Sequence, residues 1–166
     1  MSVLVALIAI NVVVSVLGFQ AFQDPSGERA KRFLFIPHDV ARGENGLGML
    51  LSHFAHGSLV HLAFNMIALY SFADPVLEIV GPAKFLLIYV AAGVGSDLLV
   101  FALRKDDPTY RCLGASGSVF GIVMAAVVLR PDTSVMLFFV PVPIPGPVFM
   151  LGYAIISIVL IARKHR

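Results

Sequence analysis

Long stretches without a charged residue constrain this chain more than any other feature of its sequence. Only 12 Lys or Arg and 10 Asp or Glu occur among 166 residues, while 58% of the residues are hydrophobic. Soluble domains carry roughly a quarter charged residues, and disordered chains are poor in apolar ones. The composition therefore excludes a soluble globular domain and a disordered chain, and it predicts an all-α, multi-pass protein of the lipid bilayer.

The remaining composition excludes other classes of partner and cofactor. A formal net charge of +2 is too small and too scattered for a nucleic-acid binder. The single cysteine, Cys112, permits neither an internal disulfide nor a cysteine metal cluster. His53, His56 and His61 lack the i, i+4 spacing of helical zinc ligands. We expect no metal and no cofactor.

Five apolar stretches approach the roughly 20 residues that a spanning helix needs. They cover about residues 1–22, 54–73, 83–103, 115–130 and 147–162 of one domain, 1–166. The first lacks a basic leading segment and is longer than the apolar part of a typical signal peptide, so we interpret it as a retained helix. The polar stretch 24–47 is predicted to be a long loop that could cover a site.

Four alternating prolines interrupt the last long stretch without charges. They occupy positions 141, 143, 145 and 147, and they cannot all lie inside a helix. Residues 133–140 are too short to cross a bilayer as a helix. We therefore predict a re-entrant or interfacial, strand-like segment at 133–140, followed by the last helix.

Three histidines and an asparagine lie in the second apolar stretch or directly before it, where polar groups are costly. His61 and Asn65 are four residues apart and project from one helix face. Two neutral hydrogen-bond donors directed at one point could stabilise an oxyanion. The alternative is that both side chains only bond to a neighbouring helix.

A second group of small and polar residues, 114–121, opens the fourth stretch. Ser116 lies where a helix begins, so unpaired backbone N–H groups and the positive end of the helix dipole are beside its hydroxyl. Gly117 and Gly121 are four apart and allow close approach of another helix. A simple packing seam that happens to contain a serine is the alternative.

Taken together, the two segments resemble one family, the rhomboid intramembrane serine proteases. The motifs are His56-x4-His61-x3-Asn65 and Gly114-Ala115-Ser116-Gly117-x3-Gly121. Between them, residues 73–81, with Glu78 at the acidic position, are similar to the family's turn after its second helix. The resemblance implies a rhomboid-like bundle, with five of the six core helices present here.

The resemblance also implies a role for each matching residue. Ser116 is the nucleophile, and His61 and Asn65 are the oxyanion donors, beside the Ser116 N–H. His56 is a supporting polar residue, and the motif's glycines are Gly114, Gly117 and Gly121.

The family's general base is a histidine on a sixth helix, for which these 166 residues contain no counterpart. A serine hydroxyl needs an adjacent base to become a good nucleophile, so we expect the chain alone to be inactive. We also expect Gly117 and Gly121 to line a groove that the missing helix leaves open. His165 is a poor substitute, because Lys164 and Arg166 flank it as a basic stop signal.

The function that best fits these features is an intramembrane serine endopeptidase that cleaves transmembrane protein substrates through a Ser–His dyad. One alternative is a non-catalytic rhomboid-like protein that binds transmembrane clients. Another is an unrelated transporter or channel subunit, with Asp97 and the proline-rich break as its site. The latter leaves the serine motif unexplained.

Overall fold

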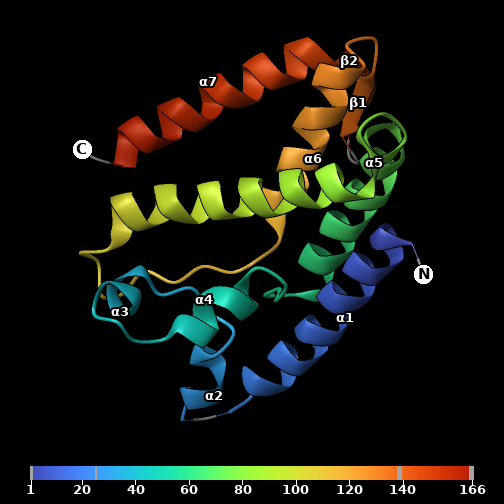
Figure 1. Cartoon of the computed structure of the whole chain (residues 1–166). Coiled ribbons are helices and arrows are strands. Elements are labelled where there is room, and N and C mark those ends of the chain that lie inside the picture. Colours follow the sequence, from blue (N-terminus) through green and yellow to red (C-terminus); the bar gives the residue numbers. More distant parts are fainter. Residues whose placement is uncertain (1, 25, 138–139, 165–166) are drawn as a thin grey trace.

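The structure is a computed structural model, and it describes residues 2–24, 26–137 and 140–164. Within these residues, four long helices, three short ones and a β-hairpin follow one another (Figure 1). They are α1 (Val3–Ala21), α2 (Glu28–Lys31), α3 (Pro37–Ala41), α4 (Gly46–Ser52), α5 (Leu59–Arg104), α6 (Ser116–Leu129), β1 (Ser134–Leu137), β2 (Val140–Pro145) and α7 (Gly146–Lys164).

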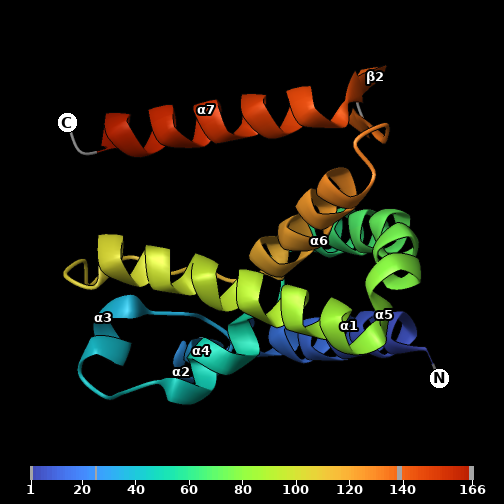
Figure 2. The same ribbon diagram turned by 45° about the horizontal axis from the view of Figure 1, so that its top comes forward.

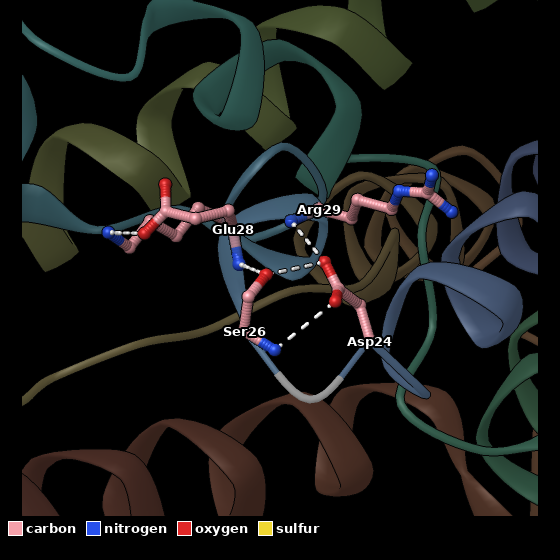
Figure 3. Close-up of polar contacts among 5 residues, drawn as sticks. Asp24, Ser26, Glu28 and Arg29 are labelled. Carbon is pink, nitrogen blue, oxygen red and sulfur yellow. Dashed lines mark hydrogen bonds and ion pairs between the residues drawn. The ribbon is translucent and has the colours of Figure 1, made fainter.

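The predicted loop 24–47 is wrong in part, because short helices occupy much of it. Asp24 and Ser26 organise the start of α2: the Ser26 hydroxyl donates to the Asp24 carboxylate over 2.8 Å, and the Arg29 N–H donates to the same carboxylate over 3.3 Å (Figure 3). Hydrogen bonds from Ser26 lower the pKa of Asp24. Helices this short have few local sequence signals, because helix formation is weak below about a dozen residues.

Helix α5 contains the second predicted stretch from Leu59 onward and the whole of the third. The chain reverses at Gly81, whose φ of 76° and ψ of 169° interrupt the helix. Positive φ is accessible to glycine at little cost, and Pro82 suits the first turn of the following arm. The two arms are residues 59–80 and 82–104. The resemblance implied a turn over 73–81, but residues 73–80 are helical and the turn is confined to Gly81.

The strand-like segment after α6 is confirmed as β1, although its partner was not predicted. β1 pairs antiparallel with the proline-rich strand β2, with Val135 opposite Ile144. Prolines lack the N–H that a ladder needs, so they are tolerated only in a short two-stranded edge such as this. The hairpin redirects the chain, and α7 then runs in the same general direction as the second arm of α5 (Figure 2).

The core lies where α1, both arms of α5 and α6 meet. Its buried members include Leu7, Leu69, Phe85 and Ile122. Among the described residues, α1 and α5 are long and apolar enough to cross a membrane, while α6 and the Gly146–Ile156 part of α7 are shorter apolar helices. The count of five spans stays a prediction.

Candidate active site

Ser116 is the first residue of α6, as predicted, and its side chain is exposed between two cavities. On one side is an apolar groove of about 810 Å³, lined by both arms of α5, α6, β1 and α7. On the other is a more polar cavity of about 190 Å³, which His53 and Asp97 also line. A hydroxyl in this position is accessible from the groove and lies beside polar groups.

Gly114 brings His61 and Ser116 together. A Cβ atom on this glycine would lie 3.1 Å from His61 Nε2 and 3.8 Å from Ser116 Oγ, and its φ of +127° is one that L side chains rarely adopt. The Gly114 N–H donates to the Ser52 carbonyl over 2.8 Å, which anchors the segment ahead of Ser116. Any side chain at Gly114 would displace the His61 ring, so glycine is required for both space and conformation.

Asn65 follows His61 by one turn of α5 and lines the same groove as Ser116. Its side chain is 8% exposed. Its Nδ2 is buried and finds no hydrogen-bond partner within the described part of the chain. A buried donor without a partner costs about 1–3 kcal/mol, so this amide is a donor available for a ligand.

The start of α6 adds backbone donors to these two side chains. Ala115 precedes the helix, and no side chain caps it there. The first N–H groups of a helix have no partner inside the helix, and the dipole makes this end positive. Three kinds of group that can donate a hydrogen bond therefore lie along the groove or the segment that contains Ser116: the His61 imidazole, the Asn65 carboxamide and the first N–H groups of α6. Such an arrangement can stabilise an oxyanion.

His56 lies in the turn before α5, because the helix begins at Leu59 and not at residue 54 as predicted. Ser58 caps the start of α5, and its hydroxyl oxygen accepts the His61 N–H over 3.2 Å. His56 is fully buried, and its ring meets the His61 ring edge to face with centroids 4.9 Å apart. Burial, with His61 nearby, lowers the pKa of His56 to about 4, so its imidazole is neutral at pH 7.

Two other contacts at the site were not predicted. His53 Nε2 lies 2.9 Å from the Asp97 carboxylate, which joins the turn before α5 to the second arm of that helix. Ser15 of α1 contacts His56 Nδ1 at 2.9 Å. Spacing along the chain contains no sign of either pair. For Ser15, the only local signal was a second polar residue, Asn11, four positions earlier in an otherwise apolar helix.

Gly117 and Gly121 were expected to line an open groove, and they do. They also admit another helix closely, as their spacing predicted, and this helix is the second arm of α5. A Cβ on Gly117 would lie 2.6 Å from Ser96 Cβ, and one on Gly121 would overlap the Ala92 Cβ. The glycines therefore serve the contact between α5 and α6 as well as the groove.

None of the described histidines is placed as a base for Ser116, whose hydroxyl makes no hydrogen bond to any described residue. His38 pairs with Asp39 at 3.5 Å in α3. His53 pairs with Asp97, His56 contacts Ser15, and the His61 ring lies against Gly114. His165 lies outside the described residues.

The chain was compared with known families, curated proteins and solved structures. A model of the Rhomboid domain matches residues 44–165. Presenilin-associated rhomboid-like protein, mitochondrial, of Mus musculus is 36% identical over 95 residues, which is 57% of this chain and 25% of that protein. Rhomboid protein 1, mitochondrial, of Saccharomyces cerevisiae is 29% identical over 142 residues, 83% of this chain and 39% of the relative.

Rhomboid protease GluP of Bacillus subtilis is 40% identical over 70 residues, which is 42% of this chain and 13% of that protein. The match to the mouse protein thus spans about a quarter of that relative's length. No solved structure matches the chain.

Proposed function

The chain belongs to the rhomboid family, and from that premise we propose that it forms the Ser116-bearing part of a multi-pass intramembrane serine endopeptidase. In this proposal five segments cross the bilayer: α1, the two arms of α5, α6 and α7. The observation that carries it is that Ser116 Oγ and His61 Nε2 both lie next to Gly114, with the unpartnered Asn65 amide in the groove that Ser116 lines. The substrates are transmembrane proteins.

The residues support an acyl-transfer reaction in two steps. Ser116 Oγ attacks a peptide carbonyl, and its proton passes to a base. The negative charge that forms on the carbonyl oxygen is stabilised by His61 Nε2–H, Asn65 Nδ2–H and the Ser116 N–H. The base then protonates the leaving amine, and water hydrolyses the acyl-enzyme, regenerating the hydroxyl.

The base comes from a further helix in this proposal, and the groove is where that helix packs. The groove borders Ser116 directly, and its lining is mostly apolar, as a helix–helix contact requires. A base has to reach hydrogen-bond distance of the proton that it accepts. Histidine on a helix in this groove meets that condition, whereas the described histidines are engaged elsewhere.

A complementation experiment tests the proposal. Residues 1–166 alone are expected to cleave a transmembrane reporter at background rate and to react poorly with a fluorophosphonate. Co-expression with a histidine-bearing sixth helix of the rhomboid type should restore both reactions, and Ser116→Ala should abolish them. The matched control replaces the histidine of the added helix by alanine.

Two results would contradict this assignment. Cleavage that persists in Ser116→Ala would exclude Ser116 as the nucleophile. Cleavage by the isolated chain that is lost in His165→Ala would identify the terminal histidine as the base instead. Binding of transmembrane segments without cleavage, even with the added helix present, would favour the client-binding alternative.

A further inference from the structure

Helix α1 turns two polar side chains into the protein interior. Asn11 and Ser15 lie four residues apart on the buried face of this otherwise apolar helix, and both are 0% exposed. Asn11 bonds to the Leu7 carbonyl of its own helix over 2.8 Å and reaches the Tyr89 hydroxyl of α5 at 3.4 Å. Ser15 faces the turn that contains His56. The family match begins only at residue 44. Asn11 and Ser15 therefore lie outside the matched segment, although they contact residues inside it.

The hydrogen bonds of Ser15 determine which nitrogen of His56 carries the proton. The Ser15 hydroxyl has one hydrogen, and it donates this to the Phe54 carbonyl over 3.1 Å. Its oxygen lies 2.9 Å from His56 Nδ1. The Phe54 carbonyl can only accept, so both contacts of the Ser15 oxygen are satisfied together when Nδ1 carries a hydrogen and donates it. This arrangement favours the Nδ1–H tautomer of His56, with the lone pair on Nε2.

The oriented His56 ring in turn contacts His61. The two rings meet at an interplanar angle of 78° with centroids 4.9 Å apart. His56 Nε2 is buried and has no partner in the described part of the chain, so Ser15 is the side chain that fixes the ring. On the other side of this ring contact, the His61 ring lies against Gly114, two residues before Ser116.

We propose that Ser15 is a positioning residue of the active site: its hydroxyl holds His56 as the Nδ1–H tautomer, and the His56 ring holds His61 against Gly114. This inference rests on the proposed function only for its catalytic consequence, since the tautomer and the ring contact exist without any reaction. It makes α1 part of the site rather than a membrane anchor alone. A purely apolar contact would not need a hydroxyl between a carbonyl and an imidazole.

The tautomer can be measured directly by NMR of the chain with ¹⁵N-labelled histidine in detergent micelles. Nitrogen chemical shifts distinguish Nδ1–H from Nε2–H. Wild type should show His56 as Nδ1–H, and Ser15→Thr, which retains the hydroxyl, should do the same. Ser15→Ala should produce a mixture of tautomers and also shift the His61 resonances. Val16→Ala, at the neighbouring and 45% exposed position of α1, is the matched control and should change neither.

In the complemented enzyme, Ser15→Ala should lower kcat about tenfold with KM within twofold, because a misplaced donor weakens transition-state stabilisation. Ser15→Thr should retain most of the rate. An Nε2–H tautomer of His56 in wild type would overturn the proposal, and this measurement does not depend on any variant folding. Unchanged His61 resonances or kcat in folded Ser15→Ala would overturn it as well. If the tautomers behave as expected but Ser116→Ala leaves cleavage intact, the proposed function fails and not the positioning.

Discussion

The two terminal helices, α1 and α7, have the same length of 19 residues and a similar apolar character, yet they pack very differently. α1 buries Leu4, Leu7, Asn11, Ser15, Gly18 and Ala21 against the rest of the protein. α7 exposes large apolar side chains such as Leu151 and Ile156, and it lines only part of the open groove beside Ser116. Hydrophobicity alone therefore does not decide which helix docks.

The difference lies in small and polar residues on one face. On α1, Asn11, Ser15 and Gly18 recur at helical spacing, and the serine and asparagine bond to other segments. In α7, a Cβ on Gly152 would meet nothing within 4 Å. In an apolar environment, close packing and hydrogen bonds distinguish one apolar helix from another. His56, which Ser15 of α1 contacts, lies on the side where α1 docks, whereas the groove that contains Ser116 and Asn65 is lined in part by α7.

The largest effect is expected from the two proposed oxyanion donors, His61 and Asn65. In the complemented enzyme, His61→Ala and Asn65→Ala should each lower kcat by about 10²–10³, the usual cost of one oxyanion donor. Leu151→Ala, at a 65% exposed position of α7, should change kcat by less than about twofold. Steady-state cleavage of a transmembrane reporter measures all three. Equal losses of kcat in Leu151→Ala and His61→Ala would contradict the contrast between the exposed face of α7 and the groups around Ser116.

A pair of Gly→Ala substitutions compares packing on the two sides. Gly121→Ala should cost about 1–3 kcal/mol, because the new methyl overlaps Ala92 of α5. Gly152→Ala should instead stabilise α7 by up to about 1 kcal/mol, since alanine favours a helix and space is available. Both variants gain the same helix propensity, so their difference reports packing. Thermal unfolding in detergent, followed by circular dichroism, provides the measurement. Similar melting temperatures would show that α6 and α5 are not closely packed.

Acid should lower the stability of the protein through His56, which is buried next to Ser15 of α1. The pKa of His56 is about 4 in the folded protein and about 6.5 when exposed. Between these values the unfolded chain binds more protons, so the free energy of unfolding should fall as pH is lowered from about 6.5 towards 4. His56→Gln should remove this part of the pH dependence, and His38→Gln, on the short helix α3, should leave it in place. A wild-type melting temperature that is constant from pH 7 to 5 would contradict the burial of His56.

The smallest effect is expected at the end of α6 opposite to Ser116. Glu78 and Arg130 form an ion pair of 2.7 Å between the first arm of α5 and the end of α6, and both side chains are largely exposed to the surroundings. Exposed pairs contribute about 0–1 kcal/mol and are screened by salt. Glu78→Gln should therefore lower stability by less than about 1 kcal/mol, less still in high salt. A cost of several kcal/mol would show that this pair holds the two helices together.

Several features follow from local sequence alone. The charge-free stretches predict apolar helices because a helix within a membrane satisfies its own backbone hydrogen bonds. The helical period places His61 and Asn65 on one face of α5, and Gly114 with Ser116 marks a helix start, whatever the rest of the chain does. The strand at β1 follows from the run of prolines behind it. The resemblance to rhomboid proteases rests on these same local motifs.

Other features required the tertiary structure. The approach of His61 to Ser116 at Gly114, the contact of Ser15 with His56 and the pairing of His53 with Asp97 each join segments that are far apart in the chain. Such contacts depend on how helices pack, and packing depends on shape complementarity over whole surfaces, which no spacing rule encodes. The docking of α1 on the rest of the protein is of the same kind. Sequence determined which side chains were available for chemistry, and only the packing of α1, α5 and α6 decided which of them meet at Ser116.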